Sequence, residues 1–257
     1  MKINKDKHIG RVLFIVEGSK TEFAILYRIF CKLLGYSYIE KRRNYPTYFV
    51  SNNDRFSQVA VINTRESNIK DISENETYLD DLFDVLREEY HFPVDQSAIY
   101  YLFDRDPKSN TDPSLIEKYI LSLADPYDND DGYKAGQLLL SYPSVESYII
   151  SNFKNDTNLL RFQLGKDAKT YLGKNTDIQT NKISEETVMK AATIFLEYLR
   201  SEQIDLNIDE FAEASHFFQM RFWEEKYAKN SYFMPKIRLK MPKIKLFSPK
   251  IFLGKSI

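Results

Sequence analysis

Short, almost wholly apolar runs alternate with segments of helical periodicity through the first half of the chain. Such runs are typical of strands that are buried on both faces of a parallel sheet. We expect four of them, at residues 11–16, 58–63, 98–103 and 136–141. Between them, apolar residues recur every three or four positions, which predicts helices at residues 21–34, 77–90 and 114–124. The alternation predicts an α/β fold, with a parallel sheet flanked by helices.

The pattern changes after about residue 155. The remaining strongly periodic segments, 185–202 and about 208–227, are helical, so we expect a helical C-terminal lobe over residues 155–234. Residues 36–50 are aromatic and basic without a clean period, which we interpret as a hairpin or an insertion. The α/β domain then spans residues 1–154.

The charge of the chain is unevenly distributed. The net charge is −1, but residues 235–257 hold seven Lys or Arg and no acid, which leaves 29 basic against 37 acidic residues in the rest. Proline recurs every seventh residue there and forbids a continuous helix, so we predict an extended or disordered tail, or an edge strand. This tail and the segment E-K-R-R-N-Y-P-T-Y at 40–48 are candidates for phosphate contacts and base stacking. The alternative for the tail is a solvated end.

Cysteine usage and the N-terminal residues bear on location. Cys31 is the only cysteine, so a disulfide framework and a cysteine zinc site are excluded. The first apolar run ends at Glu17 and is too short for a signal peptide core or a membrane span. We expect a cytoplasmic protein without a membrane partner.

Acidic residues stand directly after two of the predicted strands. Glu17 follows the first strand, and Asp104 and Asp106 follow the third. Open parallel sheets bind ligands beyond the carboxyl ends of their strands, and residues two apart in an extended chain point the same way. If these strands are neighbours, each pair of carboxylates repels by about 4 kcal/mol at roughly 4 Å and an effective dielectric near 20. We therefore predict a Mg²⁺ or Mn²⁺ site suited to phosphate chemistry.

Glu22 has a different explanation at this level. Ser19 and Glu22 have the S-x-x-E spacing of a capping box, in which both side chains satisfy backbone donors at a helix start. An apolar periodic segment begins directly afterwards, as that motif requires. We interpret Glu22 as a capping residue rather than a catalytic one.

Three segments together resemble the Toprim domain. V-E-G-S-K-T-E after the first strand and F-D-R-D after the third match the glutamate and the D-x-D of that family. The third segment, S-Y-P-S-V-E-S-Y-I-I-S-N-F at 141–153, is similar to the S-N-P-x-x-E-x-W-hydrophobic-F signature of RloB-like and OLD-type abortive-infection nucleases. It departs from that signature at Tyr142 and Tyr148. The resemblance covers about residues 11–153 and does not extend to the C-terminal hundred residues.

The resemblance implies a Toprim-like sheet and a Mg²⁺- or Mn²⁺-dependent endonuclease of bacterial antiphage defence. It implies that Glu17, Asp104 and Asp106 hold the metal and take part in catalysis, and that Glu146 is a further active-site acid. Glu146 also has a purely structural explanation, on the polar face of a helix that begins at Pro143.

Further candidates and alternatives stay open at this stage. Lys166, together with Lys169, is a candidate for stabilising negative charge at the site. The expected substrate is nucleic acid, DNA or RNA, with tRNA among the candidates. The chain has no P-loop, so control by ATP requires an ATPase partner, and a homo-oligomer stays open. The alternatives are a non-catalytic Toprim-fold subunit that assembles with an ATPase and a primase-like nucleotidyl transferase.

Overall fold

The structure is a computed structural model of the whole chain. It describes residues 3, 5, 8–39, 47–63, 76–89, 91–106, 112–127, 136–155, 160 and 162–201. The predicted helix at about 208–227 and the proline-repeat tail at 235–257 lie outside the described residues, as does most of the 40–48 segment.

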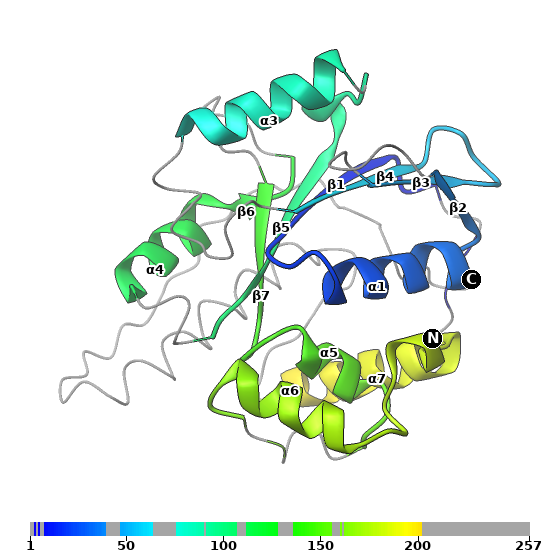
Figure 1. Cartoon of the computed structure of the whole chain (residues 1–257), viewed down its shortest axis with the longest axis vertical. Coiled ribbons are helices and arrows are strands. Elements are labelled where there is room, and N and C mark those ends of the chain that lie inside the picture. The colour runs from blue at the N-terminus through cyan, green and yellow to red at the C-terminus, as the bar shows by residue number, and fades with distance from the viewer. Residues whose placement is uncertain are drawn as a thin grey trace.

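A seven-stranded sheet forms the centre of the molecule, in the order β2-β3-β4-β1-β5-β7-β6 (Figure 1). Its parallel middle consists of the four predicted strands, which are β1 (Arg11–Val16), β4 (Gln58–Asn63), β5 (Ala98–Asp104) and β7 (Gly136–Ser141). The predicted bounds hold for three of them, and β5 is one residue longer. The prediction of an α/β fold with a mostly parallel sheet is confirmed.

The edges of the sheet are antiparallel. β2 (Tyr36–Ile39) pairs with β3 (Thr47–Ser51), and β3 pairs with β4, so the hairpin interpretation of residues 36–50 is confirmed. Tyr48 of β3 is buried against Phe92, so this residue of the 40–48 segment does not offer its ring to a base. At the other edge, β6 (Ala124–Asp125) pairs with β7 where the sequence predicts the end of a helix.

Helices cover both faces of the sheet, because side chains alternate along each strand. They are α1 (Thr21–Tyr27), which continues as a π-helical segment at Arg28–Leu33, α3 (Glu76–Glu88) and α4 (Pro113–Ser122). Leu13 and Ile15 of β1 point into a core shared with α3 and α4. Phe14, on the opposite face, belongs to a second core covered by α1 and its π-helical continuation. Figure 1 shows α1 on the other side of the sheet from α3 and α4.

The chain after the sheet is helical as far as it is described. The helices are α5 (Glu146–Ser151), α6 (Gly165–Lys174) and α7 (Glu185–Ser201), with a short 3-10 turn at Thr180–Lys182 between α6 and α7. Another 3-10 turn, at Val94–Gln96, precedes β5. α7 matches its prediction, whereas α6 was not predicted. Ile149 of α5 and Ile178 pack on Ile25 of α1, so these helices rest on the α1 side of the molecule. The domain boundary at residues 154 and 155 stays a prediction. Each helix within the described ranges is too short or too polar to cross a lipid bilayer.

Candidate metal centre

The candidate site lies where two parallel strands leave the sheet. β1 and β5 are neighbours in the sheet, with Val16 opposite Leu102. This pairing is the condition under which the sequence predicts that Glu17 and Asp104 lie close together. The chain continues to β4 on one side of β1 and later to β5 on the other side. Parallel sheets hold their ligands at such switch points.

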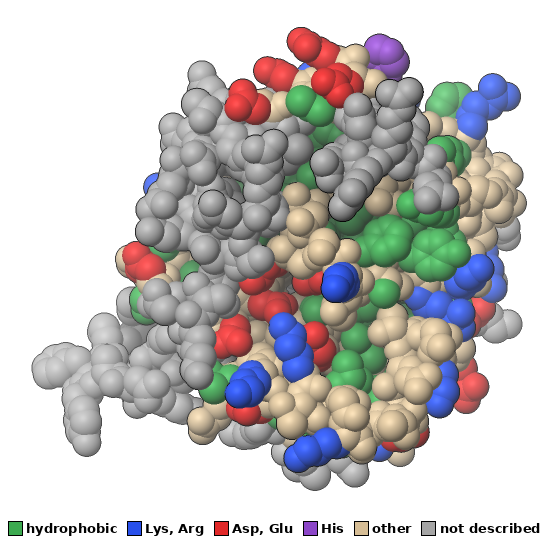
Figure 2. Space-filling view, viewed as in Figure 1, with side chains coloured by type: hydrophobic (Ala, Val, Ile, Leu, Met, Phe, Trp, Pro, Cys, Tyr) green, Lys and Arg blue, Asp and Glu red, His purple; other side chains and the backbone are tan. Residues whose placement is uncertain are grey.

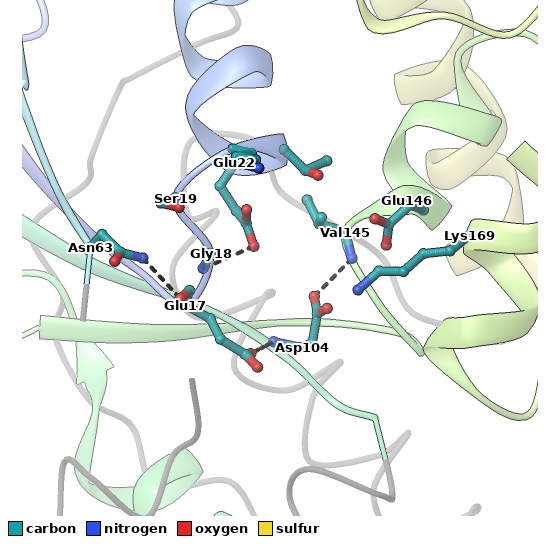
Figure 3. A pocket seen from close by; sticks show the side chains of 11 residues that line it. Glu17, Gly18, Ser19, Glu22, Asn63, Asp104, Val145, Glu146 and Lys169 are labelled. Atoms are coloured by element: carbon teal, nitrogen blue, oxygen red, sulfur yellow. Dashed lines mark hydrogen bonds between the residues drawn. The ribbon is translucent and has the colours of Figure 1, made fainter. Parts of the chain in front are cut away.

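A pocket of about 370 Å³ opens at this edge of the sheet (Figure 3). It is lined by the turn after β1, the ends of β4 and β5, the start of α5 and one residue of α6, namely Glu17, Gly18, Ser19, Lys20, Thr21, Glu22, Asn63, Asp104, Val145, Glu146 and Lys169. Four of these are carboxylates with little exposure: Glu17 9%, Glu22 7%, Asp104 9% and Glu146 4%. The two lysines, Lys20 and Lys169, are exposed.

Backbone and hydroxyl donors fix three of the carboxylates. Asp104 donates its backbone N–H to Glu17 Oε2 at 2.7 Å, and Val145 donates its N–H to Asp104 Oδ1 at 2.8 Å (Figure 3). Ser144 Oγ donates to Glu146 Oε2 at 2.6 Å. Glu17, directly after β1, is thus tied to β5, and Asp104, the last residue of β5, is tied to the residue that precedes α5. These bonds hold the site together across three segments of the chain.

The capping-box interpretation of Glu22 is wrong. α1 begins after Lys20, and no side chain caps it, so the Ser19 hydroxyl does not play the predicted role. Glu22 Oε1 instead accepts the N–H of Gly18 at 3.2 Å, and its side chain lines the pocket. A Cβ at residue 18 would collide with the Glu22 carboxylate, so a larger residue there would displace that carboxylate from its present position. Glu22 therefore belongs to the acidic cluster.

Burial shifts the ionisation of the two strand-end acids. Burial is the largest cause that raises the pKa of Glu17 to about 8, against the lowering effect of the Asp104 N–H, and the charges of Asp104 and Glu22 raise it further. Burial also raises the pKa of Asp104 to about 7, with added repulsion from Glu146 and Glu22. Lys169 lowers both pKa values. Ionising both acids is therefore unfavourable without a nearby cation.

Asp106 lies outside the lining of the pocket. Its Oδ2 accepts the N–H of Gly165 at 3.1 Å, which places a negative charge at the N-terminus of α6. Asp104 and Asp106 therefore bind N–H groups of different segments, although they are only two residues apart. The role of Asp106 as a metal ligand stays a prediction.

The two candidate charge stabilisers of α6 differ in position. Lys166 is exposed and is not among the residues that line the pocket, whereas Lys169 lines it together with Lys20. Sequence reasoning also missed Asn63, which ends β4 and donates from Nδ2 to the Glu17 carbonyl oxygen at 2.9 Å. A polar residue directly after the apolar run of β4 was the available signal for it. Glu146 begins α5, so the predicted helix start at Pro143 is wrong.

The donor set suits a hard divalent cation. Carboxylate oxygens are the ligands that Mg²⁺ and Mn²⁺ prefer, and here four carboxylates face two ammonium groups. Within the described residues, no three Asp, Glu, His or Cys side chains already converge closely enough to hold an ion. Mg²⁺ does not need such a cage, because it keeps several waters and is commonly bound by one or two carboxylates together with substrate phosphates. Glu17 and Asp104 fit that mode.

Comparison with known proteins identifies no relative of this chain. No protein-family model, curated protein or solved structure matches the chain. The functional argument therefore depends on the geometry of this pocket and on the motifs of the sequence.

The raised pKa values predict a pH-dependent stability in the absence of metal. The folded protein holds protons on Glu17 and Asp104 that the unfolded chain releases near pH 4 to 5, so the free energy of unfolding should fall as the pH rises toward 8. The free energy of unfolding of Glu17→Gln and of Asp104→Asn should each exceed that of the wild type by about 1 to 3 kcal/mol at pH 8. This difference should shrink toward pH 4. Urea unfolding in EDTA at both pH values measures this.

Divalent metal provides the control for that experiment. Millimolar Mg²⁺ or Mn²⁺ should stabilise the wild type at pH 8 and close the gap to both variants, because only the wild type keeps the full ligand set. Variants less stable than the wild type at pH 8 in EDTA would contradict the assigned charge repulsion.

The contact between Asp106 and α6 predicts the effect of a single methyl group. A Cβ at Gly165 would lie 2.8 Å from Asp106 Oδ2 and 3.1 Å from Ser144 Cβ. Gly165→Ala should therefore reduce the free energy of unfolding by about 1 to 3 kcal/mol. The matched control is Gly173→Ala in the same helix, where no atom lies within 4 Å of the new Cβ. That change should be neutral or stabilising by up to about 1 kcal/mol. Equal effects in chemical denaturation would refute the close-contact explanation.

Proposed function

We propose that this chain is a cytoplasmic, metal-dependent nuclease with a Toprim-like fold, which hydrolyses phosphodiester bonds of DNA or RNA in antiphage defence. The α/β sheet supports the fold part of this proposal, since the motif acids follow β1 and β5 as the resemblance implies. The helical C-terminal lobe belongs to the same proposal, beginning with α6 and α7.

One observation carries the proposal. Glu17 and Asp104 come from sites 87 residues apart in the sequence, and the side chain of the first is bonded to the backbone of the second inside one pocket. Structural acids rarely gather in this way, because burying like charges without a partner is unfavourable. A pocket in which two acids, Glu17 and Asp104, have raised pKa values is a functional-site candidate on physical grounds.

The residues of the pocket have distinct roles in this proposal. Glu17 and Asp104 hold the cation, which supplies charge neutralisation for a phosphate and lowers the pKa of bound water. Lys169 lies at the same pocket and offsets negative charge that develops on the phosphate. Glu146, held by Ser144, accepts the proton of the attacking water, and the oxygen that leaves phosphorus regains a proton from Lys169 or solvent.

Cleavage assays on three nucleic acids test this function. Wild-type protein should cut at least one of supercoiled plasmid, circular single-stranded DNA and total tRNA, with Mg²⁺ or Mn²⁺ and not with EDTA. Asp104→Asn should lower the rate at least about 100-fold, since loss of groups that merely orient metal ligands already costs 10- to 100-fold. Glu117→Gln is the control, because it makes the equivalent change at an exposed acid of α4.

The other outcomes of this assay identify the alternatives. Equal cleavage by Asp104→Asn and the wild type would place the chemistry elsewhere. Nucleotide incorporation in place of cleavage would favour the primase-like transferase. Metal binding without either reaction would favour the non-catalytic subunit that assembles with an ATPase.

Lys166 and Lys169, two of the lysines of α6, separate the site geometry from the sequence-based assignment. Lys169→Ala should lower the cleavage rate about 100- to 1,000-fold, which is typical of removing one group that stabilises developing charge. Lys166→Ala should change it less than about threefold, as expected for a solvated surface charge. Single-turnover rates at saturating metal measure both. The reverse order of effects would restore Lys166 as the functional lysine.

A further inference from the structure

A cluster of aromatic rings lies between α1 and the edge strands β2 and β3, near the acidic pocket. Phe23 and Tyr27 of α1 and Tyr38 of β2 contact one another, with ring centroids 6.0 to 6.1 Å apart. Beneath them, Phe49 of β3 is fully buried and contacts all three. Phe49 belongs to the core, whereas the three outer rings are partly exposed, with Tyr38 at 40%.

Core packing alone does not explain the outermost ring. β2 is an edge strand, and its side chains alternate between the two faces, so Tyr36 and Tyr38 point to the same side. Tyr36 is buried and completes the core, but Tyr38 and its neighbour Ile39 are both 40% exposed. An exposed tyrosine on an edge strand, beside two partly exposed rings, is typical of a binding surface rather than of a core.

Basic side chains flank the rings and connect them to the pocket. Lys20, Phe23 and Tyr27 are spaced i, i+3 and i+7, so they follow one face of α1 over about 10 Å. Lys20 is itself a lining residue of the pocket. At the other end, Lys32 Nζ lies 5.5 Å from the centroid of the Tyr27 ring. Figure 2 shows the apolar group beside the acidic side chains of the site, with a basic side chain between them.

We propose that this row of Lys20, Phe23, Tyr27, Lys32 and Tyr38 binds unpaired nucleotides that flank the scissile phosphate, so that the substrate is single-stranded. The inference rests on the proposed nuclease function and deepens it. Aromatic rings bind nucleobases by stacking, and lysines bind the phosphates that link successive nucleotides. Proteins that bind single strands without sequence preference combine these two kinds of contact. In a duplex the bases are stacked on each other and their faces are unavailable, so a duplex should not use this row.

A binding assay with one exposed ring changed tests the inference. Fluorescence anisotropy measures the affinity for labelled strands of about twelve thymidines or uridines, a length within known single-strand site sizes, and for a duplex of equal length. Ca²⁺ replaces Mg²⁺ in one arm and EDTA is present in the other. Tyr38→Ala should weaken single-strand binding by about fivefold to a hundredfold, and Tyr38→Phe should restore it, because stacking needs the ring. Duplex affinity should be unchanged.

Phe56→Ala is the matched control. Phe56 is 68% exposed and precedes β4, at the opposite end of the strands from the pocket. Its loss should leave all affinities at the wild-type level. A larger loss on thymidine or on uridine strands in Tyr38→Ala identifies DNA or RNA as the source of the bound strand.

Contrary outcomes are equally definite. Unchanged single-strand affinity in Tyr38→Ala, or an equal loss on the duplex, overturns the inference. Self-association of the wild type that Tyr38→Ala abolishes in light scattering also overturns it, in favour of a surface for a second copy. The cleavage assay tests the nuclease function separately. Binding that depends on the Tyr38 ring, without metal-dependent cleavage, would support the single-strand binding surface and reject the nuclease function. Metal-dependent cleavage together with unchanged single-strand binding by Tyr38→Ala would support the nuclease function and reject the binding surface.

Discussion

Carboxylate burial at the junction of β1 and β5 is the constraint on which this site depends. Glu17, Asp104, Glu22 and Glu146 come from three segments of the chain and share one pocket. Burial and the neighbouring charges oppose the ionised forms of Glu17 and Asp104 there. Hydrophobic burial in the two cores on either side of the sheet holds the strand ends together against this repulsion. The free energy gained by burying the two cores therefore offsets the cost of burying these acids.

Backbone donors decide where each acid points. The N–H groups of Gly18, Asp104, Val145 and Gly165 bind the four carboxylates of Glu22, Glu17, Asp104 and Asp106 in turn. Backbone groups cannot change rotamer, so an acid held in this way has a defined direction before any ligand arrives. Such preorganisation is valuable at catalytic sites, because the groups need not reorganise during the reaction.

The sequence predicted the sheet better than it predicted the site. The central strands were found because buried parallel strands form continuous apolar runs, and Glu17 and Asp104 were found because acids directly after such runs are conspicuous. Glu22 was misassigned because S-x-x-E describes local spacing only, whereas its carboxylate turns back to Gly18 and the pocket. Lys169 was named beside Lys166 but could not be preferred to it, since its position depends on the tertiary placement of α6. Asn63 was missed, because its role depends on the pairing of β4 with β1.

The location of α1 links the acidic pocket to the aromatic surface. Lys20 directly before α1 and Glu22 in its first turn line the pocket, and Phe23 and Tyr27 follow along the side of the helix that contacts Phe49 of β3. The same helix is anchored from below by Leu26 in the core and from the side by Ile25 against Ile149 and Ile178. Because α1 contributes residues to both surfaces and packs on the sheet that carries Glu17 and Asp104, a strand stacked on the rings would lie at a defined distance from these two acids. Binding energy gained at the rings can then position a phosphate at the pocket, which is how remote contacts contribute to catalysis.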